Sequence, residues 1–189
     1  MKQVITVREA LLLIDIQNDY FPGGKFELSE PEPALAEAKN VLAYFRNEKL
    51  PVIFVKHSSP DGPFFVPGTK GAELHSELCP QEGEFVITKH APSCFLDTEL
   101  DELIEKLGIN ELTVCGMMTQ MCVDTTVRAT MDRRLPVTLL SDACAAHALV
   151  YNGKQIPAEL VNSVIFASID GTFAHVITTE EYLEGRKNI

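Results

Sequence analysis

Long hydrophobic runs are missing from this chain. Its longest apolar stretches, such as residues 10–14 and 52–55, are far shorter than the roughly 20 residues that a helix needs to cross a bilayer. The N-terminal stretch MKQVITVREA also lacks the continuous apolar core of a secretory signal peptide. We therefore expect a cytoplasmic protein that has no membrane partner.

Positive charge is also scarce. The chain has 16 Lys and Arg against 27 Asp and Glu, so its formal net charge is −11. The basic residues are scattered along the sequence and form no cluster. Because the phosphate backbone of a nucleic acid would be repelled by such a protein, we expect no nucleic-acid partner.

Paired cysteines are absent as well. The cysteines are odd in number, lack C-x-x-C spacing, and stand at positions 79, 94, 115, 122 and 144. A disulfide framework needs pairs and an oxidising compartment. We therefore expect reduced thiols, one of which could be reactive while the others fill space in the core.

No repeat, low-complexity tract or linker divides the sequence. Hydrophobic residues make up 46% and charged residues 23% of the chain, which is the balance of a globular protein. A chain of 189 residues fits one ordinary domain. We expect a single domain that spans residues 1–189.

Short β-rich apolar runs alternate with helical patterns along the chain. The runs predict strands at residues 10–15, 51–57, 85–89, 112–115, 136–140 and 174–177, and helices near 34–48, 97–107, 119–133 and 157–169. This alternation is typical of parallel βαβ crossovers. The sequence predicts a three-layer α/β/α fold with six mostly parallel strands, and the doubly wound order 3-2-1-4-5-6 is the preferred one.

Two loops, residues 16–33 and 58–83, are longer than a connection requires. They follow the first two predicted strands and carry aromatic residues. Such rings could wall a small-molecule pocket, or they could simply cap the sheet. Our candidates for the substrate pocket are Tyr20, Phe64, Phe65 and Phe95.

Three chemically reactive side chains follow or end predicted strands. Asp15 closes the first strand, Lys89 closes the third, and Cys122 follows the fourth in the run GMMTQMC. A thiolate is the nucleophile of cysteine enzymes, and a nearby ammonium and a helix N-terminus both favour the anion. Asp15 could move the proton, and backbone N–H groups of the turn could bind an oxyanion. Each residue alone also has a structural interpretation, as a turn-bracing acid, a surface lysine or a packed thiol.

The run LLLIDIQNDY, the Lys89 segment and GMMTQMC together resemble the isochorismatase-like cysteine hydrolases, which include nicotinamidase and N-carbamoylsarcosine amidase. The resemblance covers about residues 9–178. It implies a catalytic triad of Asp15, Lys89 and Cys122, and a cis peptide bond between Met117 and Met118. It also implies an oxyanion hole formed by the N–H groups of Met118 and Cys122. Gln17 and Asn18 are expected to brace the turn around Asp15.

The chain departs from nicotinamidases at their metal site. His57, Ser59 and Phe65 stand where those enzymes place an Asp and two His ligands. Phe65 cannot coordinate a metal, and a neutral Ser hydroxyl is a poor zinc ligand. We therefore expect no metal and no other cofactor.

Several functions remain open on the sequence alone. The preferred one is a cysteine-dependent hydrolase of a small amide, ureido or carbamoyl substrate, acting through a thioester on Cys122. Alternatives are isochorismatase-type vinyl-ether hydrolysis, a nicotinamidase-like amidase, and a non-catalytic binding protein that keeps the fold. The resemblance also implies a homo-oligomer, either a dimer or a tetramer, that acts on a small molecule.

Overall fold

The computed structural model describes residues 8–186 of the chain. The strands of its main sheet are β1 (Glu9–Ile14), β2 (Val52–His57), β3 (Phe85–Lys89), β4 (Glu111–Met117), β5 (Val137–Ala145) and β8 (His175–Ile177). They lie in the order β3-β2-β1-β4-β5-β8, and every pairing between neighbours is parallel. Counted along the chain, this is the predicted 3-2-1-4-5-6 order, so the predicted fold class is confirmed.

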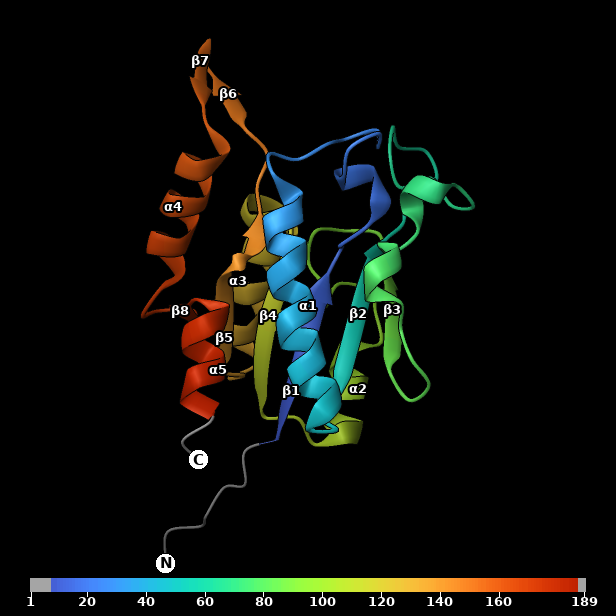
Figure 1. The fold of residues 1–189 in the computed structure, drawn as a ribbon, viewed down its shortest axis with the longest axis vertical. Coiled ribbons are helices and arrows are strands. Elements are labelled where there is room, and N and C mark those ends of the chain that lie inside the picture. Colours follow the sequence, from blue (N-terminus) through green and yellow to red (C-terminus); the bar gives the residue numbers. More distant parts are fainter. Residues whose placement is uncertain (1–7, 187–189) are drawn as a thin grey trace, which may run out of the picture.

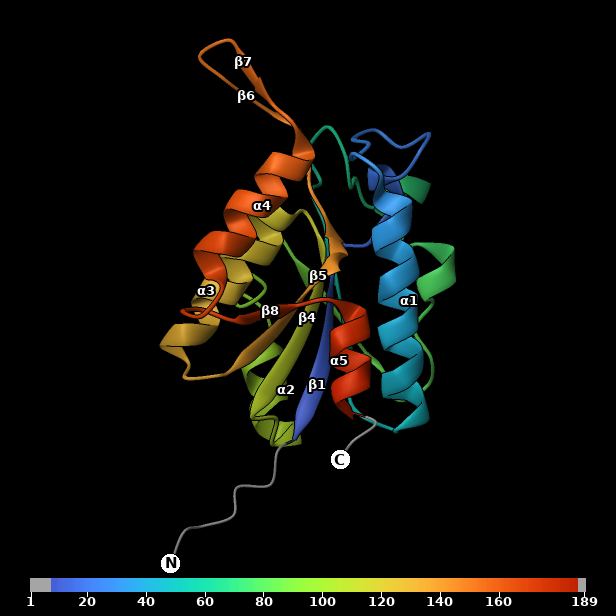
Figure 2. The same ribbon diagram turned by 60° about the vertical axis from the view of Figure 1, so that its left-hand side comes forward.

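Helices cover both faces of the sheet, as Figures 1 and 2 show. On one face lie α1 (Pro31–Asn47) and α5 (Thr179–Arg186), and on the other lie α2 (Leu100–Leu107), α3 (Asp124–Asp132) and α4 (Ala158–Ile169). Within residues 8–186, no helix combines the length and the apolar character needed to cross a bilayer.

The central strand β1 is buried along its whole length. Because successive side chains of a strand point to opposite faces, Leu11 and Leu13 enter the core beneath α1. Leu12 and Ile14 enter the second core, beneath α2 and α3. Burial on both faces explains why this strand is a continuous apolar run without polar alternation.

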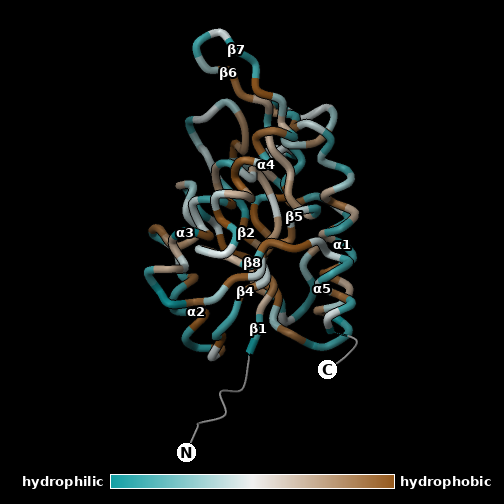
Figure 3. Tube along the Cα trace, turned by 90° about the vertical axis from the view of Figure 1, so that its left-hand side faces the viewer, coloured by the Kyte–Doolittle hydropathy of each residue, from teal (hydrophilic) through white to brown (hydrophobic). Residues whose placement is uncertain are grey.

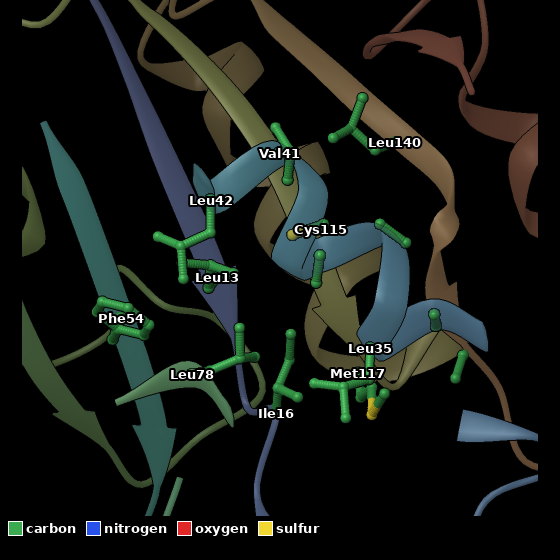
Figure 4. Close-up of a cluster of buried hydrophobic side chains, with 14 of the residues drawn as sticks. Leu13, Ile16, Leu35, Val41, Leu42, Phe54, Leu78, Cys115, Met117 and Leu140 are labelled. Atoms are coloured by element: carbon green, nitrogen blue, oxygen red, sulfur yellow. The ribbon is translucent and has the colours of Figure 1, made fainter. Parts of the chain in front are cut away.

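Helix α1 covers β1, β4 and β5 with one apolar face, and its colour in Figure 3 alternates along the tube. Figure 4 shows Leu35, Val41 and Leu42 of α1 beside Leu13 of β1 and Cys115 of β4. The helix begins at Pro31, a few residues before the predicted start. Proline suits the first turn of a helix because the N–H that it lacks would have no partner there.

The strand pair β6 (Leu149–Tyr151) and β7 (Lys154–Ile156) was not predicted. It forms a hairpin that projects from the body of the molecule (Figures 1 and 2). Its turn is Asn152-Gly153, with φ of 48° and 73°, which is the signature of a tight two-residue β-turn. The Asn-Gly pair was therefore a usable signal in the sequence.

Helix α5 was also not predicted, because its apolar residues do not recur at helical spacing. It is held by buried Glu9 at the start of β1. The Tyr182 hydroxyl donates to Glu9 Oε1 over 2.9 Å, and Arg186 pairs with Glu9 Oε2 over 2.6 Å. A tertiary contact, rather than a local pattern, therefore fixes this helix.

Candidate active site

The carboxyl ends of β1, β3 and β4 bring Asp15, Lys89 and Cys122 together. The lysine side chain reaches past the end of β2, so that its Nζ lies 2.7 Å from Asp15 Oδ2. The same Nζ lies 3.1 Å from Cys122 Sγ. Asp15 and Lys89 are 0% exposed and Cys122 is 5% exposed. The acid, amine and thiol that we selected from the sequence thus form one buried cluster.

Burial dominates the charge states of this cluster. It raises the pKa of Asp15, and the ammonium of Lys89 only partly offsets that effect. Burial by itself would lower the pKa of Lys89, but the negative charge of Asp15 and Cys122 outweighs burial, so the net direction is upward. Lys89 is therefore a permanent ammonium beside two groups that both hold their proton more tightly than usual.

The pKa of Cys122 departs from our sequence-based reasoning, which had Lys89 and a helix N-terminus lowering it. Burial and then Asp15 raise the pKa of this thiol, and Lys89 opposes them without reversing the sign. In addition, α3 begins only at Asp124, and Cys122 belongs to a π-helical turn, Thr119–Val123, before it. The environment of Cys122 therefore favours the thiol over the thiolate.

The turn that carries the cysteine begins with a cis peptide bond between Met117 and Met118, the bond at which the resemblance places one. Val123 and Met121 both donate their N–H to the Met118 carbonyl, over 3.2 and 3.0 Å. These bonds wrap the backbone around Cys122. The oxyanion hole from the N–H groups of Met118 and Cys122 stays a prediction.

Gln17 and Asn18 brace the loops around Asp15. The Gln17 amide donates to the carbonyls of His57 and Ala72 over 2.9 and 2.8 Å, and its Oε1 accepts the His57 N–H over 2.7 Å. Asn18 Nδ2 donates to the Lys70 carbonyl over 2.8 Å. Both side chains bind backbone groups of neighbouring loops, which agrees with a bracing role.

Three of the four pocket candidates lie in one aromatic cluster. The rings of Tyr20 and Phe65 meet edge to face with centroids 4.7 Å apart, and Phe64 lies 5.0 Å from Phe65. Phe26 and His147 complete the cluster. The ring centroid of Phe26 lies 4.6 Å from that of Phe64, on which it stacks, and 4.8 Å from that of His147. We did not select these two residues from the sequence, although Phe26 belongs to the long loop of residues 16–33 that supplied Tyr20.

The aromatic cluster adjoins the reactive side chains. Tyr20 is 2% exposed, and the charges of Cys122 and Asp15, after burial, help to raise the pKa of its hydroxyl. The fourth candidate, Phe95, lies elsewhere: it packs in the core beneath α2 and α3, with the Arg133 guanidinium 3.9 Å above its ring. Phe95 is therefore not part of the aromatic cluster.

A cavity of about 600 Å³ lies between the N-terminal end of α1, the β6–β7 hairpin and α4. Asp15, Lys89 and Cys122 do not line it, although Cys144 does. Burial and the neighbouring Asp142 both act to raise the pKa of the Cys144 thiol, which is about 12. Among residues 8–186, no Lys, Arg or His lines this cavity to activate the Cys144 thiol. We therefore place the candidate active site at the buried cluster of Asp15, Lys89 and Cys122.

The residues at the nicotinamidase metal positions do not fit a metal. Phe65 is 1% exposed, and its ring packs against Tyr20. The backbone N–H of Ser59 donates to the Phe65 carbonyl over 3.0 Å. A packed phenyl ring offers no lone pair, so a three-ligand site cannot be completed at these positions.

A second set of ligand-type atoms, from Asp15, His57 and Cys122, gathers within 4.8 Å. However, Lys89 Nζ contacts all three side chains, at 2.7, 3.0 and 3.1 Å. An ammonium already fills the centre of this set, and a divalent cation would have to displace it. These residues do not fit a metal either.

A parallel α/β sheet with a buried acid, amine and cysteine at its carboxyl edge defines the class of α/β cysteine hydrolases. Residues 9–181 match the isochorismatase domain model, and the chain belongs to the isochorismatase family of hydrolases. This confirms the resemblance that the sequence motifs indicated.

Individual relatives agree with this assignment. The chain is 44% identical to the isochorismatase family protein YddQ of Bacillus subtilis (strain 168), over 93% of this chain and 98% of YddQ. It is 35% identical to the secreted isochorismatase effector Isc1 of Verticillium dahliae, over 93% of this chain and 90% of Isc1. The crystal structure of an isochorismatase-family hydrolase from Oleispira antarctica superposes with a TM-score of 0.93 at 37% identity, and the match covers 97% of this chain and 100% of that one.

More distant relatives include a nicotinamidase, an amidohydrolase and a streptothricin hydrolase. Nicotinamidase 3 of Arabidopsis thaliana is 29% identical over 81% of this chain. The ureidoacrylate amidohydrolase RutB of Serratia proteamaculans is 28% identical over 63%. A streptothricin hydrolase of Streptomyces noursei is 32% identical over 74% of this chain, which spans 50% of that enzyme.

Proposed function

We propose that this hydrolase cleaves a small amide, ureido or carbamoyl substrate through a thioester on Cys122. The observation that carries the proposal is the position of one buried ammonium, Lys89 Nζ, 2.7 Å from Asp15 Oδ2 and 3.1 Å from Cys122 Sγ. The amidohydrolase relatives support the choice of a C–N bond.

Lys89 lies between Asp15 and Cys122, so it can stabilise a negative charge on either of them. A proton transfer between these two residues leaves the net charge of the cluster unchanged. When Asp15 takes the thiol proton, one negative charge moves from the carboxylate to the sulfur. The ammonium contacts both atoms, so it stabilises the anion before and after the transfer. In a buried site of low dielectric constant, such a fixed charge stabilises an anion far more than it does in solvent.

The reaction then follows from these groups. The Cys122 thiolate attacks the substrate carbonyl carbon, the C–S bond forms, and the carbonyl oxygen becomes an oxyanion facing the N–H groups of Met118 and Cys122. The C–N bond breaks while Asp15 returns its proton to the leaving nitrogen. Asp15 next takes a proton from water, and the hydroxide attacks the thioester carbon. The C–S bond breaks, the acid product leaves, and Asp15 passes its proton to the Cys122 sulfur, which restores the thiol and the carboxylate.

Vinyl-ether hydrolysis of an isochorismate-type substrate is the second candidate. It is favoured by the raised pKa of Asp15, which is due first to burial, because a protonated carboxyl could protonate the substrate. Cys122 would be dispensable for that reaction. A nicotinamidase-like activity with a bound metal is less well supported, because the residues at the metal positions do not fit.

The test is a panel of primary amides, ureido acids and carbamoyl amino acids, with ammonia release as the readout, beside a vinyl-ether substrate. We expect turnover of at least one C–N substrate, a covalent mass adduct on Cys122 after rapid acid quench, and no turnover by Cys122→Ala. Full C–N turnover by Cys122→Ala would refute the covalent mechanism. Vinyl-ether turnover by Cys122→Ala, without any C–N activity, would establish the second candidate.

We further propose that the protein acts as a homo-oligomer on its small-molecule substrate. Large apolar side chains are exposed on the β6–β7 hairpin and on α4: Leu149, Val150, Tyr151, Leu160 and Val164. An apolar surface of this kind supports an interface between copies of the chain. Light scattering should give a dimer or tetramer mass, and Val164→Lys should lower that mass.

We also propose a cytoplasmic location. The free cysteines support a reducing compartment such as the cytoplasm.

A further inference from the structure

His57 is a fourth side chain in contact with the buried cluster. It is the last residue of β2 and pairs in register with Lys89 of β3. Its Nδ1 atom lies 3.0 Å from Lys89 Nζ. The imidazole is half-buried, whereas Lys89 is fully buried.

Counting donors and acceptors around Lys89 shows one acceptor too many. Four atoms lie within hydrogen-bond distance of Nζ: Asp15 Oδ2 at 2.7 Å, the Ala91 carbonyl at 3.0 Å, His57 Nδ1 at 3.0 Å and Cys122 Sγ at 3.1 Å. An ammonium has only three N–H groups and no lone pair. The carboxylate and the carbonyl take two of them, so His57 and Cys122 share the third.

The same count fixes the tautomer of His57. Because an ammonium cannot accept a hydrogen bond, the Nδ1 atom that faces it must carry the lone pair. A neutral imidazole then has its proton on Nε2. Burial, then Lys89 and then His90 lower the pKa of His57 to about 4; Asp15 and Cys122 are the acidic groups within reach. The ring is therefore neutral across the physiological range.

The backbone of His57 is held in place by the motif that also carries the acid. Gln17 donates to the His57 carbonyl over 2.9 Å and accepts its N–H over 2.7 Å. Gln17 is itself 0% exposed. The buried clamp fixes both backbone groups of His57, and thereby the place from which the imidazole reaches Lys89.

We propose that His57, as the Nε2–H tautomer, is a positioning residue that holds the Lys89 ammonium through Nδ1 whenever the Cys122 sulfur is acylated. The inference rests on the proposed function. The attacking thiolate is a charged acceptor for Lys89, whereas the sulfur of the thioester is uncharged and accepts only weakly, so Lys89 loses this partner when the acyl group is transferred. His57 then accepts the third N–H and keeps Lys89 beside Asp15 during the attack of water. His57 itself exchanges no proton in this step.

Two variants of His57 distinguish the effect of its hydrogen-bond acceptor from the effect of the volume of its ring. The Oδ1 atom of His57→Asn can stand near the place of Nδ1 and accept from Lys89, whereas His57→Leu has no acceptor. Because Gln17 binds only the backbone, its clamp survives in both variants. We use a Cys79→Ser background, since Cys79 is exposed and would complicate mass analysis.

The kinetic test measures the first-turnover burst and the steady state on the best C–N substrate. In His57→Leu we expect kcat to fall by about tenfold or more, as for loss of one hydrogen bond to a charged group. The burst amplitude should remain, and intact-mass analysis should show the Cys122 adduct accumulating. His57→Asn should recover to within about threefold of wild type. Equal kcat in wild type and His57→Leu would overturn the proposal, as would equal loss in both variants.

A second test needs no substrate, so it separates this inference from the proposed function. Long-range ¹H–¹⁵N NMR of the histidine rings, with His57 assigned from the Asn variant, should show the neutral Nε2–H tautomer at pH 7. In Lys89→Met the pKa of His57 should rise above its wild-type value of about 4. An Nδ1–H tautomer or an imidazolium at pH 7 would refute the positioning role even if Cys122 is the nucleophile. Conversely, C–N turnover by Cys122→Ala would refute the proposed function and leave the NMR result intact.

Discussion

Replacing Lys89 by methionine should destabilise the protein strongly. The ion pair with Asp15 has a 2.7 Å separation, and both side chains are 0% exposed. Methionine keeps much of the volume but removes the charge, so the Asp15 carboxylate is left in the core without its counter-ion. Breaking a buried pair in this way typically costs about 3–5 kcal/mol.

The loss should depend on pH in a defined direction. Burial raises the pKa of Asp15 and Lys89 opposes the rise, so the folded-state pKa of Asp15 climbs further in Lys89→Met. The folded variant then binds more protons than the unfolded chain, and stability falls as pH rises. Because the folded-state pKa of Asp15 is already raised in wild type, the extra loss in the variant begins only above that wild-type pKa. It then grows by up to ~1.4 kcal/mol per pH unit until the higher folded-state pKa of the variant is passed.

Urea unfolding of wild type and variant at pH 5, 6, 7 and 8 measures this difference. Lys39→Met is the matched control, because Lys39 pairs with Glu77 at the surface with side chains 43% and 50% exposed. It should cost less than about 1 kcal/mol. The double variant Lys89→Met/Asp15→Asn should recover most of the stability, since no buried charge remains. If Lys89→Met costs no more than the control, or its cost does not change with pH, the buried ion pair has been assigned wrongly.

Four further predictions concern other parts of the site. Asp15→Asn should lower the unfolding free energy, because the buried Lys89 ammonium loses its counter-ion. In the fraction that circular dichroism shows to be folded, kcat should fall by about 100-fold or more with little change in KM, because the proton acceptor is gone. Gly116→Ala should lower the unfolding free energy by more than about 2 kcal/mol in urea titration, since Gly116 has φ of 134° and a Cβ would lie 2.1 Å from the Ile14 carbonyl; a stable variant would refute this packing. Iodoacetamide should label exposed Cys79 before buried Cys122, and peptide mapping should show that this first label leaves activity unchanged. Dialysis against EDTA should leave turnover intact; activity that is lost and then restored by zinc, iron or manganese would revive the nicotinamidase interpretation.

The fold was predictable because its signals are local and strong. A strand buried on both faces is a continuous apolar run, as in β1, where every residue is buried. Helix α1 buries Ala34, Ala38 and Val41, a spacing that is visible in the sequence. Helix α5 has no such periodic apolar pattern. A hydrogen bond and an ion pair to Glu9 hold it in place instead. Bonds between residues so far apart leave no periodic trace.

The three reactive residues were predictable for a topological reason. In a parallel sheet, the carboxyl ends of all strands lie at one edge, so polar residues that follow apolar strands must meet there. Asp15 and Lys89 obey this rule directly. Phe95 does not, because the segment after β3 turns away and packs under Arg133. A position close to a strand end therefore predicts the edge of the sheet at which a residue lies. It does not predict which other side chains that residue will contact.

The direction of the thiol pKa shows what sequence reasoning leaves out. From the sequence, Lys89 is a positive charge near Cys122, which alone would lower that pKa. In the structure, Asp15 also pairs with the Lys89 ammonium. Burial is the first cause of the rise in the pKa of Cys122, and the charge of Asp15 is the second. The ammonium contacts both groups, so the proton transfer that we propose between the Asp15 oxygen and the Cys122 sulfur leaves the net charge of the site unchanged. If Cys122 is the nucleophile, as we propose, burial keeps it as a thiol until a substrate carbonyl is in place, and a thiol is less open than a thiolate to alkylation and oxidation between turnovers.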